Sequence, residues 1–278
     1  MIHFKETKKE RNEYMRAIDP HLHTDRMKGK EVETLAIAGV EAAILPTAHL
    51  MPWIVSAKTL LNIWDNYVDF QVLHAKSLGI MLRVTLGVPF YGMGEEDKIE
   101  CLKKLPEYLK HENVVGMGEI GMDAGIPAEE ELFRIQLNLA KEHNLPIIVH
   151  CPTPMEPQAY TVCEKIINVI KDENFPIERA ILDHTGFNTL DLRLNSGANV
   201  GLSLCYDKLR PEDAAEIVEK YAKTRDQLLI NSEFGYSGEG YYSVPRAILA
   251  MRRLGLSREI IEHITWDNPK KLFNLQIN

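Results

Sequence analysis

The chain has 278 residues, 45% of them hydrophobic and 26% charged, and its 40 acidic and 32 basic residues give a formal net charge of −8. This size suits one large α/β domain, and no apolar run reaches the roughly 18 residues needed to cross a membrane. The acidic balance excludes broad binding to a nucleic-acid backbone, so a nucleic-acid substrate would have to be held locally by metal or a few basic side chains.

Eight short apolar runs predict buried β-strands, because several are nearly continuous in valine, isoleucine and leucine, as in parallel strands covered on both faces. In chain order they span residues 16–21, 41–47, 80–88, 113–120, 145–151, 179–185, 198–204 and 227–234. Residues 1–14 precede the first run and predict a short N-terminal extension. We expect residues 15–278 to form a single domain.

Longer amphipathic stretches between these runs predict helices. Residues 127–144 carry apolar side chains at helical spacing after an acidic first turn. Residues 210–225 begin with Pro211 at a helix start, and residues 243–255 end at Gly255, a residue suited to ending a helix. The last stretch, 257–275, predicts a short helix, a break at Pro269 and a final apolar turn.

The alternation of strand and helix predicts a parallel sheet, and eight units at this length predict closure into a (β/α)8 TIM barrel. A doubly wound open sheet is the alternative. The sequence disfavours it, because no G-x-G-x-x-G segment follows the first strand.

Imidazoles and carboxylates stand at the predicted ends of five strands. The carboxyl ends of barrel strands meet at one rim, so we expect these side chains to converge. Two of the histidines are two positions apart on one strand and therefore point the same way. The six residues are His21, His23, Glu119, His150, His184 and Glu233.

Four imidazole nitrogens and two carboxylates suit divalent metals, with zinc the first choice and manganese, iron or magnesium as alternatives. Six ligands exceed what one catalytic zinc with an open position needs. They predict two ions about 3.5–4 Å apart, bridged by a water and by Glu119, whose strand lies between the two histidine groups.

Four further residues are candidate substrate contacts. His49 follows the second strand, while Arg83 and Tyr206 are expected to end the third and seventh. Asp123, which follows the fourth strand, is expected to hold a metal ligand or touch substrate, with a turn-capping role as the alternative.

Several segments together resemble the TatD family of metal-dependent hydrolases, within the amidohydrolase superfamily. D-P-H-L-H at residues 19–23 resembles the family's D-x-H-x-H, and V-V-G-M-G-E-I-G-M-D at 114–123 resembles V-G-E-I-G-L-D. Residues 133–151 and the closing W-D-N-P-K-K-L-F-N-L resemble two further family blocks. The resemblance implies a two-metal centre, with His21, His23, Glu119 and the strand-eight acid on one ion and Glu119, His150 and His184 on the other.

Two departures from the family pattern indicate a divergent branch. Asn231, Ser232 and Glu233 stand where the family usually has E-T-D, so the strand-eight carboxylate reaches one methylene further. The surroundings of His184, in D-H-T-G-F-N, also differ from the family's usual sequence.

We expect a hydrolase in which metal coordination lowers the pKa of a water and Glu233 accepts its proton as the catalytic acid/base. By resemblance the substrate is a phosphodiester, as for a deoxyribonuclease, presented as a small molecule or a short nucleic acid. The alternative is a carboxylic ester, lactone or amide. A catalytically idle metal-binding barrel is a third possibility, disfavoured because six aligned ligands have no evident structural purpose.

The four cysteines show no C-x-x-C spacing and are expected to be free thiols. The charged start of the chain, residues 1–16, has no apolar core for a signal peptide, so we expect a cytoplasmic protein with no membrane partner. The sequence leaves the oligomeric state open.

Overall fold

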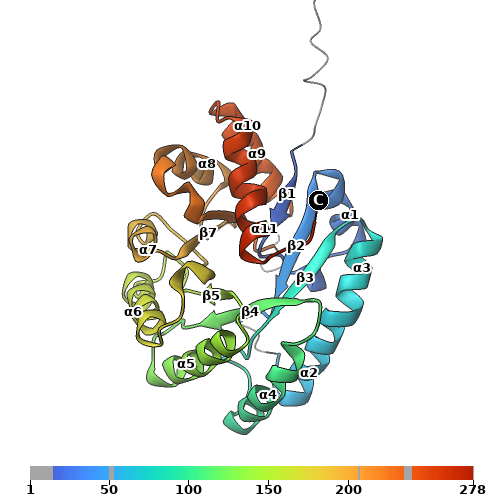
Figure 1. Ribbon diagram of the computed structural model, residues 1–278, viewed down its shortest axis with the longest axis vertical. Helices are drawn as coiled ribbons and strands as arrows, with labels where there is room; N and C mark the ends of the chain where they lie inside the picture. Colours follow the sequence, from blue (N-terminus) through green and yellow to red (C-terminus); the bar gives the residue numbers. More distant parts are fainter. Residues whose placement is uncertain (1–14, 50–52, 206, 235–239, 278) are drawn as a thin grey trace, which may run out of the picture.

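The computed structural model describes residues 15–49, 53–205, 207–234 and 240–277. Eight parallel strands lie side by side in chain order and form a nearly closed barrel, with helices outside them (Figure 1). This confirms the predicted TIM barrel, and each predicted strand is present. The strands are β1 (Ala17–Asp19), β2 (Val40–Pro46), β3 (Met81–Leu86), β4 (Val114–Gly121), β5 (Ile147–His150), β6 (Ala180–Leu182), β7 (Asn199–Ser203) and β8 (Leu228–Asn231).

The barrel closes beyond the ends of its first and last strands. Within the described ranges no strand ladder joins β8 to β1. Past those strands, the Glu233 amide donates to the His21 carbonyl at 2.9 Å and the His23 amide donates to the Phe234 carbonyl at 3.0 Å. The closure therefore fixes candidate site residues against one another through their backbones.

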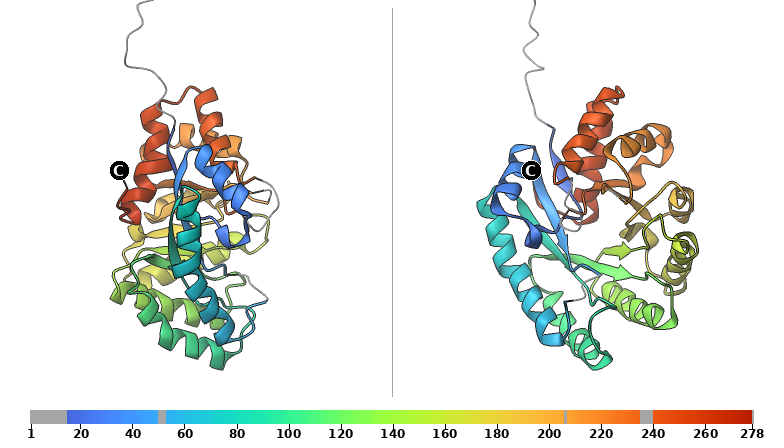
Figure 2. Two further views of the ribbon diagram at one scale, coloured as in Figure 1. Left: turned by 90° about the vertical axis from the view of Figure 1, so that its right-hand side faces the viewer. Right: turned by 180° about the vertical axis from the view of Figure 1, so that it is seen from behind.

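The helices surround the strands (Figure 2). They are α1 (Gly29–Ile37), α2 (Ala57–Asp65), α3 (Val72–Ser77), α4 (Glu95–Tyr108), α5 (Pro127–Glu142), α6 (Ala159–Asp172), α7 (Leu190–Ser196), α8 (Pro211–Lys220), α9 (Ser243–Arg253), α10 (Arg258–Glu262) and α11 (Asn268–Leu272). The predicted helices over 127–144, 210–225 and 243–255 correspond to α5, α8 and α9. Gly255 adopts a left-handed backbone (φ 81°) just after α9, as expected of a residue that ends a helix.

The C-terminal stretch differs from its prediction. The chain does not break at Pro269, because a wide π turn over His263–Asp267 carries α10 directly into α11. Pro269 lies in the first turn of α11, where the missing amide hydrogen costs no hydrogen bond within that helix.

Two apolar layers surround the barrel wall, one between strands and helices and one inside. The inner layer contains Ile18, Ala42, Ile44, Ile148, Ile181, Leu229, Trp266, Phe273 and Leu275. Two positions after three of these strand residues come His150, Asp183 and Asn231. Side chains alternate along a strand, so these three face inward one layer nearer the carboxyl ends. The apolar floor thus supports a polar layer at the rim.

All four cysteines are free and buried, as predicted. Among the described residues, no helix combines the length and apolar character needed to cross a membrane. The predicted extension over residues 1–14 lies outside the described residues.

Candidate metal centre

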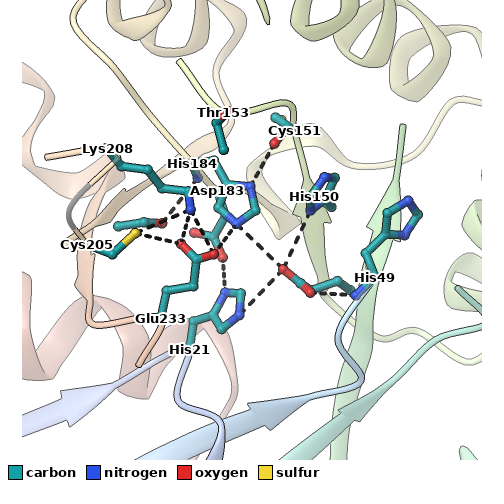
Figure 3. Close-up of polar contacts among 12 residues, drawn as sticks. His21, His49, His150, Cys151, Thr153, Asp183, His184, Cys205, Lys208 and Glu233 are labelled. Carbon is teal, nitrogen blue, oxygen red and sulfur yellow. Dashed lines mark hydrogen bonds and ion pairs between the residues drawn. The ribbon is translucent and has the colours of Figure 1, made fainter. Parts of the chain in front are cut away.

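The six predicted ligands come together at the C-terminal rim. His21 and His23 follow β1, Glu119 lies within β4, and His150 is the last residue of β5. His184 follows β6 and Glu233 follows β8, each two positions past the strand. All six side chains are buried, with no residue more than 6% exposed. Figure 3 shows His21, His150, His184 and Glu233 directed toward a common centre.

Glu119 occupies the middle of this group. Its Oε1 atom lies 3.5 Å from His21 Nε2, 3.7 Å from His184 Nε2 and 3.9 Å from His150 Nδ1. Its other oxygen accepts a hydrogen bond from the His49 amide at 2.8 Å. Ligand atoms of His21, Glu119 and His184 lie within 4.8 Å of one another, so one ion can reach all three.

Three of the histidines are held from behind by their second ring nitrogen. His21 Nδ1 lies 2.7 Å from Asp183 Oδ2, and His150 Nε2 lies 3.1 Å from Asp123 Oδ1. His184 Nδ1 donates to the backbone carbonyl of Cys151 at 2.7 Å. Such partners fix the tautomer and leave the opposite nitrogen free to bind a metal, and here each opposite nitrogen faces Glu119.

His21 and His23 face each other through their Nε2 atoms at 3.1 Å. Two nitrogens bound to one tetrahedral zinc, each at about 2.0–2.1 Å, lie about 3.3 Å apart. The observed separation is therefore close to that of two ligands on one ion. The donor set, its burial and its spacing fit a divalent metal.

Glu233 connects the histidine cluster to a lysine. Its Oε1 atom lies 3.1 Å from His184 Nε2, and Lys208 Nζ lies 3.0 Å from the carboxylate. Glu233 and His184 both adopt left-handed backbone conformations, with φ of 47° and 64°. Such conformations are costly for residues other than glycine and are concentrated at functional sites.

Buried opposite charges in the cluster support each other's ionised forms. Burial opposes charge on His21 and on His150, but the nearby carboxylates outweigh it and raise the pKa of each imidazole to about 9. Burial would raise the pKa of Glu119, yet His21 and His150 hold that pKa well below its usual range. The pKa of Glu233 is likewise lowered against the effect of burial, by His184 and Lys208. In the absence of metal, the raised pKa therefore favours protons on the same imidazole nitrogens of His21 and His150 that a metal would bind.

Residues that were not predicted from the sequence hold the candidate ligands in place. Asp183 accepts a hydrogen bond from Asn231 Nδ2 at 2.9 Å besides holding His21. The fully buried guanidinium of Arg193 donates to the carbonyls of Asp183 and His184 at 2.5 and 3.2 Å, which fixes the turn that carries both residues. The sequence offered one indication of these residues, the position of Asp183 next to His184. Arg193 is not distinguished in the sequence from other charged residues of a helix.

Two of the candidate substrate contacts, His49 and Asp123, lie beside His150. The buried ring of His49 stacks on His150 at 4.6 Å, and neither of its ring nitrogens has a hydrogen-bond partner within the described part of the chain. Asp123 Oδ1 lies 3.1 Å from His150 Nε2, so Asp123 contacts a candidate ligand, and its role as a ligand-holding residue stays a prediction.

The prediction that Arg83 ends the third strand is wrong. Arg83 lies inside β3 and not at its end, and its guanidinium donates to the carbonyl of Leu82 at 2.9 Å. The apolar run from residue 80 continues to residue 88, so the basic residue within it was mistaken for a strand end. Tyr206 lies outside the described residues.

Comparison with known proteins identifies relatives that match along nearly the whole chain. Residues 18–274 match the family described as TatD related DNase. An uncharacterized metal-dependent hydrolase of Methanocaldococcus jannaschii is 33% identical over 260 residues, which cover 93% of this chain and all of that protein.

Solved structures show the same fold. A TatD-like protein from Archaeoglobus fulgidus has a TM-score of 0.75 and 24% identity, covering 93% of this chain and all of that one. A phosphotriesterase homology protein from Escherichia coli, solved with phosphate in its active site, has a TM-score of 0.69 and 13% identity, covering 94% of this chain and all of that one.

Proposed function

The chain belongs to the TatD-related DNase family and is a metal-dependent hydrolase, and on that premise we propose that it cleaves phosphodiester bonds with two divalent ions at the rim of its barrel. The observation that carries the proposal is the buried cluster in which three imidazole nitrogens face one oxygen of Glu119. The name of the family supports a phosphodiester substrate. The six-residue donor set supports two ions, because it exceeds the needs of one.

We assign the ligands as the resemblance to the family implies. His21, His23 and Glu233 would hold one ion, His150 and His184 the other, and Glu119 both. Bound there, the ions would lower the pKa of a coordinated water and polarise a substrate oxygen.

Glu233 is the proposed acid/base. Its carboxylate is buried and kept ionised, and its pairing with Lys208 and its proximity to His184 fix its direction. It would accept the proton of the attacking water and return a proton to the leaving oxygen. On the opposite side of the centre the buried ring of His49 stacks on His150, and its two ring nitrogens have no hydrogen-bond partner among the described residues (Figure 3).

A metal-reconstituted activity panel tests the proposal. It compares bis(p-nitrophenyl) phosphate and a single-stranded oligonucleotide with lactones and N-acyl amino acids, each with and without added zinc or manganese. We expect turnover of the phosphodiesters that depends on metal and is abolished by a chelator. Turnover of carbonyl substrates alone would contradict the proposal and favour the ester, lactone or amide alternative.

A further inference from the structure

Lys208 places a buried positive charge beside the candidate metal centre. It lies in the loop between β7 and α8, and its side chain is 6% exposed. The Nζ atom lies 3.0 Å from the Glu233 carboxylate, 3.3 Å from Cys205 Sγ and 3.5 Å from Asp207 Oδ1 (Figure 3). The ammonium therefore reaches the same carboxylate that we assign to the metal and to proton transfer.

A buried ammonium needs an opposite charge, because its desolvation costs several kcal/mol. Glu233 supplies that charge here. Asp207 is a weaker partner, at the edge of hydrogen-bond distance and with a side chain 26% exposed. Since a carboxylate that binds a metal shares its negative charge with the ion, metal loading weakens the compensation that Glu233 gives Lys208.

An anionic oxygen on the substrate would restore the charge compensation of Lys208. An ammonium carries three donor hydrogens, so Lys208 can keep its contact with Glu233 while a substrate oxygen replaces the longer contact with Asp207 or with Cys205. A phosphodiester offers such an oxygen on the atom that is attacked, whereas a neutral ester does not. The position of Lys208 next to Glu233 would place that contact at the reacting group.

We propose that Lys208 binds the anionic non-bridging oxygen of the substrate and thereby selects phosphodiesters over neutral phosphate esters. The inference rests on the proposed function and adds a specificity-determining residue to it. A different role, in which Lys208 only orients Glu233, predicts equal effects on charged and neutral substrates.

Two substrates with the same leaving group separate these roles. Bis(p-nitrophenyl) phosphate carries one negative charge and diethyl p-nitrophenyl phosphate carries none, and both release p-nitrophenolate. In the metal-loaded enzyme, Lys208→Met should lower kcat/KM on the diester by about 10- to 100-fold, mainly through KM, the range of one charged hydrogen bond. Activity on the triester should fall by a smaller factor, because loss of the Lys208–Glu233 contact affects both substrates while loss of the contact with the charged oxygen affects the diester alone.

Three further variants control the comparison. Lys208→Gln keeps a donor for Glu233 without the charge and should show the same loss on the diester. Lys208→Arg should recover part of it. Lys223→Met removes the same charge from an exposed position and should change neither substrate. An equal fall on both substrates, or no change on the diester, would overturn the inference.

A binding measurement keeps the inference testable without turnover. Calorimetric titration of the metal-loaded protein with inorganic phosphate should show that Lys208→Gln binds phosphate at least about 10-fold more weakly than the wild type does. Trimethyl phosphate, which is neutral, serves as the control ligand. Elemental analysis and circular dichroism establish that the variant retains metal and fold. Carbonyl-only turnover by the wild type would defeat the proposed function, but unchanged phosphate affinity in the variant would defeat this inference.

Discussion

Replacing Gly201 with alanine should weaken metal binding without touching any ligand. Gly201 lies in β7, where an added Cβ would sit 1.6 Å from Asp183 Oδ1. Nonbonded carbon and oxygen atoms need about 3.4 Å, so the carboxylate would have to retreat by about 1.8 Å. The other oxygen of Asp183 lies only 2.7 Å from His21 Nδ1, and a movement of that size would break this hydrogen bond.

The expected cost follows from what Asp183 does for His21. Loss of a group that orients a metal-bound histidine typically lowers metal affinity by about 10- to 100-fold, equivalent to about 1.4–2.7 kcal/mol. Asp183→Asn should give a loss in the same range without added volume, because His21 and Asn231 contact different oxygens of Asp183 and the variant replaces one of these acceptors with an NH2 donor.

Competition with a chromogenic chelator measures the affinity. Gly94→Ala is the matched control, since its Cβ would meet nothing closer than Asp97 Oδ2 at 3.8 Å and its φ of −70° suits alanine. Circular dichroism separates loss of metal from loss of fold. A folded Gly201→Ala protein with wild-type zinc affinity would refute the reasoning that Asp183 secures His21.

Three other predictions concern the ligands themselves. His150→Ala should lower the metal content found by elemental analysis, and two retained equivalents would contradict its assignment. Glu233→Gln should reduce turnover by about 10²- to 10⁴-fold while most metal stays bound, and unchanged turnover would remove Glu233 from the mechanism. In the metal-free protein, the pKa of His21 and of His150 is raised from 6.5 to about 9, because carboxylates outweigh the opposing effect of burial. The two protonated imidazoles thus contribute their full stabilisation below pH 6.5. The free energy of unfolding should fall by a few kcal/mol as the pH rises from 6.5 through 9, which urea denaturation with chelator present measures. A flat profile would contradict the pairing.

The fold followed from the sequence because its signals are local and repeated. Parallel strands buried on both faces read as continuous apolar runs, and each was found within a few residues of its observed position. The C-terminal stretch was predicted less well. Whether Pro269 breaks a helix depends on the preceding π turn, and no local pattern in the sequence specifies that turn.

The clustering of the candidate ligands was predictable for a related reason. A strand end is a local feature, and the barrel topology then brings distant strand ends together, as for His21 and His184. Lys208 and Arg193 were not found, because their roles depend on which way a loop or a helix side chain turns. Arg83 shows the reverse error, since a charged residue inside an apolar run resembled an end.

The central claim is that the buried cluster binds two catalytic ions, and anomalous diffraction from crystals grown with zinc tests it most directly. We predict two peaks about 3.5–4 Å apart, on either side of Glu119. His21 Nε2 and His184 Nε2 should each lie about 2.0–2.1 Å from an ion. Zinc bound elsewhere, with no anomalous peak among these histidines, would contradict the account.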